Sequence, residues 1–85
     1  MPEAKILLIS NDEVISRYLR EKLIVNAGYS VFYETSAQAG LETFKENNID
    51  ITIAKVNRSD LNEAGLIRNL KKIDPYCIII AFVEE

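Results

Sequence analysis

Residues 5–12 form an unbroken apolar run that turns polar at its end, Lys5-Ile6-Leu7-Leu8-Ile9-Ser10-Asn11-Asp12. A short continuous apolar run suits a strand that is buried on both faces of a parallel sheet. Asparagine and aspartate are good helix N-caps, so Asn11 or Asp12 is expected to begin a helix directly after this strand. The run therefore predicts a β-α unit with polar side chains at the junction.

The rest of the chain repeats this alternation. Further strands are expected at residues 29–34, 50–56 and 77–83, and helices at residues 12–27, 36–47 and 66–73. Strands separated by helices need crossover connections, which give a parallel sheet with helices on its faces. The sequence thus predicts a three-layer αβα domain of order βαβαβαβ. The expected buried stripe of the first helix is Ile15, Tyr18, Leu19 and Leu23, which recur at helical spacing.

Composition excludes several classes of function. The 85 residues fit one domain, and 10 basic against 13 acidic residues leave no positive field that would hold nucleic acid. No apolar run approaches the roughly 20 residues of a membrane span, and no signal peptide is apparent. Without His, and with Cys77 as the lone cysteine, the chain offers no metal cluster, disulfide or nucleophile–base pair. We expect a cytoplasmic, non-enzymatic protein without a cofactor, a bound metal, a nucleic acid or a membrane.

Any site should lie at the carboxyl ends of the strands, where open parallel sheets collect their ligands. The residues expected there are Ser10, Asn11 and Asp12 after the first strand, Lys55 and Asn57 at the third, and Val83 at the fourth.

These positions carry a resemblance to the receiver domain of bacterial response regulators, a flavodoxin-like family. Residues 5–13 match the family's K-I-L-V-V-D-D-E-P without a gap, and residues 28–31 match its G-Y-x-V. Residues 37–44 resemble the A-x-x-A-L-x-x-L helix, and residues 49–54 resemble the Y-D-L-I-L-L strand. The resemblance implies the strand order 2-1-3-4 and makes residues 1–85 the N-terminal two-thirds of a receiver.

The family's phosphorylation chemistry does not carry over to this chain. Receivers have two acids after strand one that help to hold Mg²⁺, where this chain has Ser10 and Asn11, with Asp12 at a third and more variable acidic position. The phosphoacceptor position corresponds to Lys55. The following loop and the switch Thr or Ser correspond to Asn57 and Val83. Lys55 either bridges Asp12 and the Asn11 amide oxygen in place of the metal, or extends into water as a surface lysine.

The resemblance therefore implies a degenerate receiver, or pseudo-receiver, that acts by protein–protein interaction in a two-component or phosphorelay pathway. One alternative is an active receiver phosphorylated on a displaced acid, Asp12 or Asp60. Another is a small-ligand-binding flavodoxin-like domain. Because a receiver continues through a further helix, strand and helix, residues 77–83 are expected to form an open apolar sheet edge, with apolar surface also uncovered beside the first helix around Ile15, Leu19 and Leu23. The chain is therefore expected to form a homo-oligomer, either through the sheet edge or as a symmetric dimer through the helix.

Overall fold

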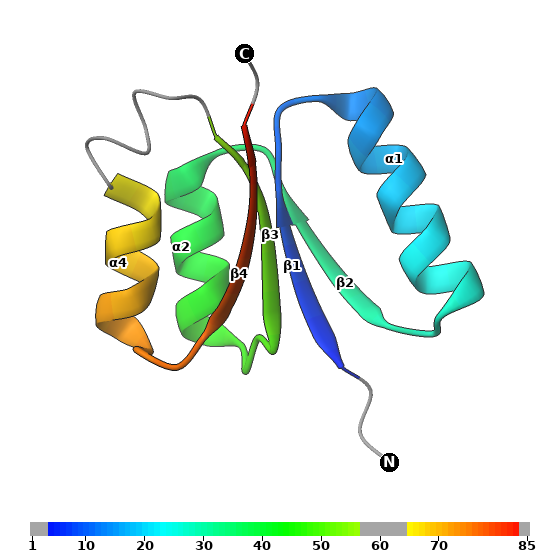
Figure 1. The fold of residues 1–85 in the computed structure, drawn as a ribbon. Coiled ribbons are helices and arrows are strands. Elements are labelled where there is room, and N and C mark those ends of the chain that lie inside the picture. The colour runs from blue at the N-terminus through cyan, green and yellow to red at the C-terminus, as the bar shows by residue number, and fades with distance from the viewer. Residues whose placement is uncertain (1–3, 57–64, 84–85) are drawn as a thin grey trace.

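The computed structural model describes residues 4–56 and 65–83, and its elements follow the expected alternation of strands and helices (Figure 1). The strands are β1 (Lys5–Ile9), β2 (Ser30–Glu34), β3 (Ile51–Val56) and β4 (Ile78–Val83). The helices are α1 (Glu13–Glu21), which continues into the π-helical turn η1 (Lys22–Asn26), α2 (Ala37–Glu46) and α4 (Gly65–Ile73). The predicted order of elements is confirmed, with bounds that differ by one or two residues.

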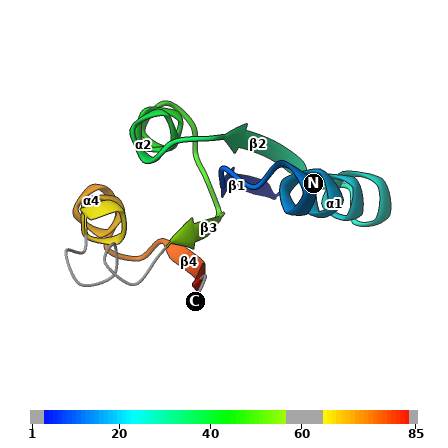
Figure 2. The same cartoon turned by 90° about the horizontal axis from the view of Figure 1, so that it is seen from above.

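All strand pairs are parallel, and the sheet order is β2-β1-β3-β4, as the resemblance implied. Seen from above, α1 lies on one face of the sheet, while α2 and α4 lie on the other (Figure 2). The three-layer αβα prediction is therefore confirmed. β4 pairs with β3 on one side, and no strand of the described residues lies on its other side.

The main core lies between the sheet and the helices α2 and α4. It contains Leu7, Ile9, Phe44, Ala54, Val56, Leu70 and Cys77. Cys77 is buried as a small apolar side chain, and this burial raises the pKa of its thiol. The helix α2 packs tightly on the sheet at Gly40, where an added Cβ would lie 2.8 Å from Cγ1 of Ile9. This contact leaves no room for a side chain at position 40.

The predicted buried stripe of α1 is wrong in part. Tyr18 is 59% exposed and Ile15 is 41% exposed, whereas Ser16 is fully buried. Leu19 and Leu23 are half-buried, so they fit the prediction better. The reason is that α1 is the sole helix of the described residues on its face of the sheet, and one flank of it has no neighbour.

The helix that begins at Glu13 widens at its end. Residues 22–26 form a π-helical turn, in which each hydrogen bond spans one residue more than in an α-helix. Gly28 then reverses the chain with φ 71, a backbone conformation that is nearly free of strain for glycine. Its N–H donates to the Ile24 carbonyl at 3.1 Å, so Gly28 ends the helix as the sequence predicted.

Candidate functional site

The predicted site residues Ser10, Asp12 and Lys55 meet at the carboxyl edge of the sheet. The strands β1 and β3 are neighbours, and their register pairs Ile9 with Ala54. The next residue of each chain segment, Ser10 and Lys55, therefore lies at the same level. Lys55 is on the face of the sheet that α1 covers, so the start of α1 comes close to it.

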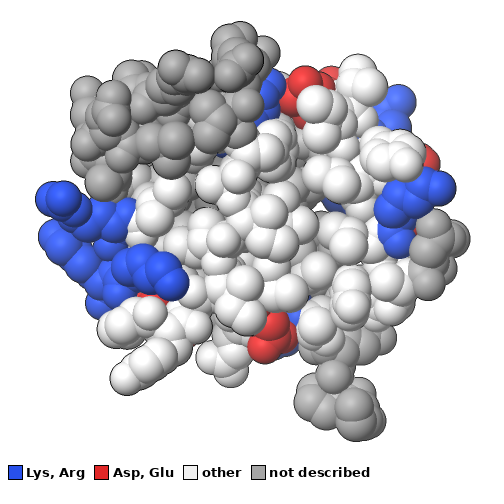
Figure 3. Space-filling model, in the orientation of Figure 1, with Lys and Arg blue, Asp and Glu red and all other residues white. Residues whose placement is uncertain are grey.

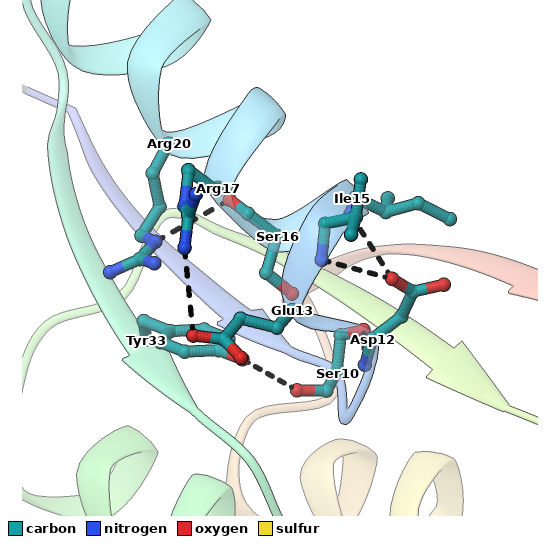
Figure 4. A network of polar contacts seen from close by, with 9 residues as sticks. Ser10, Asp12, Glu13, Ile15, Ser16, Arg17, Arg20 and Tyr33 are labelled. Carbon is teal, nitrogen blue, oxygen red and sulfur yellow. Dashed lines mark hydrogen bonds and ion pairs between the residues drawn. The ribbon is translucent and has the colours of Figure 1, made fainter.

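Asp12 serves two groups at once. One carboxylate oxygen, Oδ1, accepts the N–H groups of Val14 at 3.1 Å and Ile15 at 3.2 Å, which makes Asp12 the N-cap of α1 (Figure 4). The other oxygen, Oδ2, lies 3.6 Å from Nζ of Lys55. The expectation that Asp12 caps the helix is confirmed. The side chain of Lys55 is 14% exposed, so the alternative of a surface lysine in water is wrong.

The same contacts set the charge of Asp12. The hydrogen bond from the Ile15 N–H, foremost, and the positive charge of Lys55 hold the pKa of the Asp12 carboxyl below its ordinary value, although desolvation opposes them. Asp12 is therefore a carboxylate at neutral pH. Its partner at this edge is the ammonium of Lys55, 3.6 Å away.

Ser10 is held by its neighbours and is 2% exposed. Its Oγ accepts the Asp12 N–H at 3.0 Å, and its carbonyl oxygen accepts the hydroxyl of Tyr33 at 3.1 Å (Figure 4). The guanidinium of Arg20 in turn lies 4.4 Å from the centre of the Tyr33 ring. The sequence analysis missed Tyr33 and Arg20 as part of this site. The pairing of Tyr33 with Leu8 on β1 becomes predictable once the strand order is assumed.

The remaining predicted positions contribute less to the described site. Asn11 is exposed. The backbone of Val83 pairs with Val56 at the end of β4, one residue beyond the level of Lys55. Asn57 and Asp60 lie outside the described residues.

The described residues contain neither a metal-binding cluster nor a membrane-spanning helix. Within residues 4–56 and 65–83, no group of three or more Asp, Glu, Cys or His side chains is arranged to hold a metal ion. None of the helices in these same ranges combines the length and the hydrophobicity that a membrane crossing requires.

A four-stranded parallel sheet of order 2-1-3-4 with helices on both faces, and with its polar cluster at the carboxyl edge, defines a flavodoxin-like α/β domain. No model of a protein family matches the chain. The chain is 32% identical over 77 residues to the chemotaxis protein CheY of Thermotoga maritima, and the match covers 89% of this chain and 64% of that protein.

Solved structures agree with this similarity. A response regulator receiver domain protein from Clostridium thermocellum superposes with a TM-score of 0.79 at 30% identity, over 94% of this chain and 64% of the other. The signal receiver domain of an HD domain-containing protein from Pseudomonas fluorescens has the same fold, with a TM-score of 0.79 at 20% identity, over 95% of this chain and 59% of the other. Receiver domains are thus homologues of this chain by sequence and by structure, and the chain spans less than two thirds of the length of these relatives.

Proposed function

We propose that this chain is a phosphorylation-independent receiver-like module that acts by protein–protein interaction in a two-component or phosphorelay pathway. Its homology to receiver domains supports the pathway. The ion pair between Lys55 and Asp12, 3.6 Å apart, is the observation that carries the independence from phosphorylation. By the resemblance, Lys55 stands at the position of the phosphoacceptor, so the ion pair fills the place where a receiver would be phosphorylated.

The residues at this edge do not fit the Mg²⁺ ion that the family implies. Mg²⁺ demands an octahedron of oxygen ligands, usually including one or two carboxylates. The carboxylate of Asp12 already accepts two backbone N–H groups and faces the ammonium of Lys55. A dication here would be repelled by that ammonium and would have to displace these donors. These contacts of the Asp12 carboxylate also argue against Asp12 as a displaced phosphoacceptor. The other acid considered, Asp60, lies outside the described residues.

The wider organisation is part of the proposal. Residues 1–85 correspond to the N-terminal two-thirds of a receiver, in line with the 64% of the relative that the match covers. The module has no catalytic activity of its own and works in the cytoplasm, where a reduced cysteine such as Cys77 persists. It binds a protein of the signalling pathway, and it also associates with itself.

Acetyl phosphate with Mg²⁺, followed by intact-mass measurement, tests the proposal. We expect no gain of one phosphoryl group by the unaltered chain. Lys55→Asp alone should stay unlabelled, because Asn11 still leaves the metal short of a carboxylate. The triple variant Asn11→Asp, Lys55→Asp, Val83→Thr is the smallest change that supplies an acceptor, a second metal-binding acid and a hydroxyl.

Two results would contradict the proposal. One is labelling of the unaltered chain that a chelator abolishes, which would revive the displaced-acid alternative, and peptide mapping would then separate Asp12 from Asp60. The other is efficient metal-dependent labelling of the single variant Lys55→Asp. Gln38→Asp is the matched control, because it adds the same carboxylate on α2, on the opposite face of the sheet.

A further inference from the structure

On the side of the sheet where α1 lies, no helix of the described residues covers the half formed by β3 and β4. On this face Ile53 pairs with Ile80, and Ile51 pairs with Ile78. Ile78 is 57% exposed and Ile80 is 53% exposed. The space-filling view shows a broad surface without charge at its centre, between the basic side chains over α4 on the left and the charged side chains over α1 on the right (Figure 3). An uncharged surface with exposed isoleucines is typical of an interaction site.

The helix α1 forms a wall along this surface. Arg20 stacks on Tyr33 of β2, so the flank of α1 that carries Arg20 faces the β2 edge. At 3.6 residues per turn, Ile15 and Leu19 lie on the opposite flank, toward β3 and β4. On the side of α1 that points away from the sheet, opposite the buried Ser16, Val14 and Tyr18 are exposed.

The space beside α1 has the width of one helix. Two strands spaced about 4.8 Å apart give a floor close to 10 Å wide, and an α-helix with its side chains is about 10–12 Å across. An occupant that buries both the isoleucine floor and the flank of α1 is therefore an apolar helix lying alongside α1. The chain itself carries a helix with an apolar outer side, since Val14 and Tyr18 are 80% and 59% exposed.

We propose that the occupant is α1 of a second copy of this chain. Two copies face each other across a twofold axis that runs along the strands, and the two α1 helices lie side by side between the two sheets. Val14 and Tyr18 of each copy pack on Ile78 and Ile80 of the other, while the flanks with Ile15 meet at the axis. This arrangement rests on the self-association proposed above and assigns it a surface.

The charges of the chain agree with this choice of occupant. Glu13 and Arg17 pair with each other at 3.8 Å and lie away from the Ile15 flank. Lys55, at the end of the floor, is already paired with Asp12. The Lys22 ammonium lies 5.4 Å from the centre of the Tyr18 ring, and its flexible stem lets the charge move to the rim. The isoleucine floor thus meets a helix whose nearest charges, Glu21 and Lys22, are exposed and lie on flexible side chains that reach the rim.

The area is also sufficient. At roughly 150–250 Å² for a large side chain, the exposed fractions of Val14, Ile15, Tyr18, Ile78 and Ile80 offer on the order of 500 Å² per copy. The half-buried Ile53, Leu19 and Leu23 border this area. The two copies together bury on the order of 1,000 Å², which is the lower bound for a specific interface.

Light scattering over a concentration series tests the proposed dimer. We expect the mass to rise from 9.7 kDa toward twice that value. Tyr18→Lys and Ile80→Glu should each raise the dissociation constant by roughly thirtyfold or more, because each places a charge at the centre of the interface. Both side chains are exposed in the isolated chain, so each variant should stay folded and keep its circular dichroism spectrum. Gln38→Glu, on α2, is the matched control and should leave the dimer intact.

Mixing the two variants tests the reciprocal contact. In a mixed dimer, Lys at position 18 of one copy meets Glu at position 80 of the other, while the second contact stays unaltered. We therefore expect an equimolar mixture to form dimers although neither variant does so alone. A dimer broken by Ile80→Glu but insensitive to Tyr18→Lys would show pairing through the β4 edge and would overturn the proposed surface.

A constant mass of 9.7 kDa at all concentrations would refute self-association altogether and leave the surface to another protein. An oligomer that neither variant weakens would place the contact elsewhere and would also overturn the surface. The phosphoryl-transfer assay does not depend on these substitutions. Failure of the dimer therefore leaves the phosphorylation-independent receiver proposal standing, and failure of that proposal leaves the dimer standing.

Discussion

Substituting Gly40 by alanine sets two effects of opposite sign against each other. Alanine favours a helix interior over glycine by about 1 kcal/mol. The new Cβ, however, would lie 2.8 Å from Cγ1 of Ile9, far inside the 3.5–4.0 Å of a normal carbon–carbon contact. Ile9 is 4% exposed and cannot turn into solvent. Overpacking of this kind costs about 1–3 kcal/mol, so we expect a net loss of about 1 kcal/mol.

Gly65 provides the control for this reasoning. It is the first residue of α4, and an added Cβ there has no atom of the described residues within 4 Å, so Gly65→Ala should gain part of the roughly 1 kcal/mol that alanine gains over glycine in a helix interior. Urea unfolding followed by circular dichroism then separates the two variants by about 1–2 kcal/mol. In thermal unfolding, their midpoint temperatures move in opposite directions by about 4–8 °C per kcal/mol.

A second substitution identifies the cause of the loss at Gly40. Ile9→Val removes Cδ1, the atom of Ile9 nearest to the added Cβ. The double variant Ile9→Val, Gly40→Ala should therefore be more stable than the sum of the two single changes indicates. A Gly40→Ala variant as stable as the unaltered chain, or strict additivity in the double variant, would refute the close-packing argument.

Two further expectations follow from buried and paired groups. Thr52 is fully buried and its Oγ1 has no hydrogen-bond partner among the described residues, so Thr52→Val should raise the free energy of unfolding by about 1 kcal/mol, and a loss in urea unfolding would show that the hydroxyl has a partner. Asp12→Asn keeps an N-cap but removes the charge beside Lys55. Because the pKa of Asp12 is lowered in the folded state, the advantage of the unaltered chain is complete above the ordinary pKa of about 4 and disappears as the pH falls through the folded value. Thermal unfolding of both proteins from pH 7 to pH 2 measures this difference, and a gap independent of pH would contradict it.

The order of elements was predictable because each junction carries a local signal. Asp12 and Ser36 cap their helices through side-chain oxygens, as their residue types suggested. The continuous apolar run of β1 correctly indicated burial on both faces, since Ile6 to Ile9 are all buried. The meeting of Ser10 with Lys55 was predictable as well, because parallel strands bring their carboxyl ends to one edge.

What the sequence could not predict is which apolar side chains are covered. Ile78, Ile79 and Ile80 are identical in type, yet Ile79 packs against the core while its two neighbours are exposed. Tyr18 is a second example. Its spacing from Ile15 and Leu19 indicates an apolar stripe on the helix, but the spacing does not indicate whether another element packs on that stripe. Ion pairing at Lys55 was equally open, because the reach of a lysine side chain depends on where the helix start is placed.

The wide turn η1 changes how the length of this helix should be compared with those of its relatives. A π-helical turn is equivalent to one residue inserted into a regular helix, without any change at the two ends. The chain can thus gain or lose a residue within residues 22–26 while β1 and β2 keep their places. An evolutionary insertion in this part of the chain would be absorbed inside the helix, and a gap in an alignment belongs there rather than in the connection to β2.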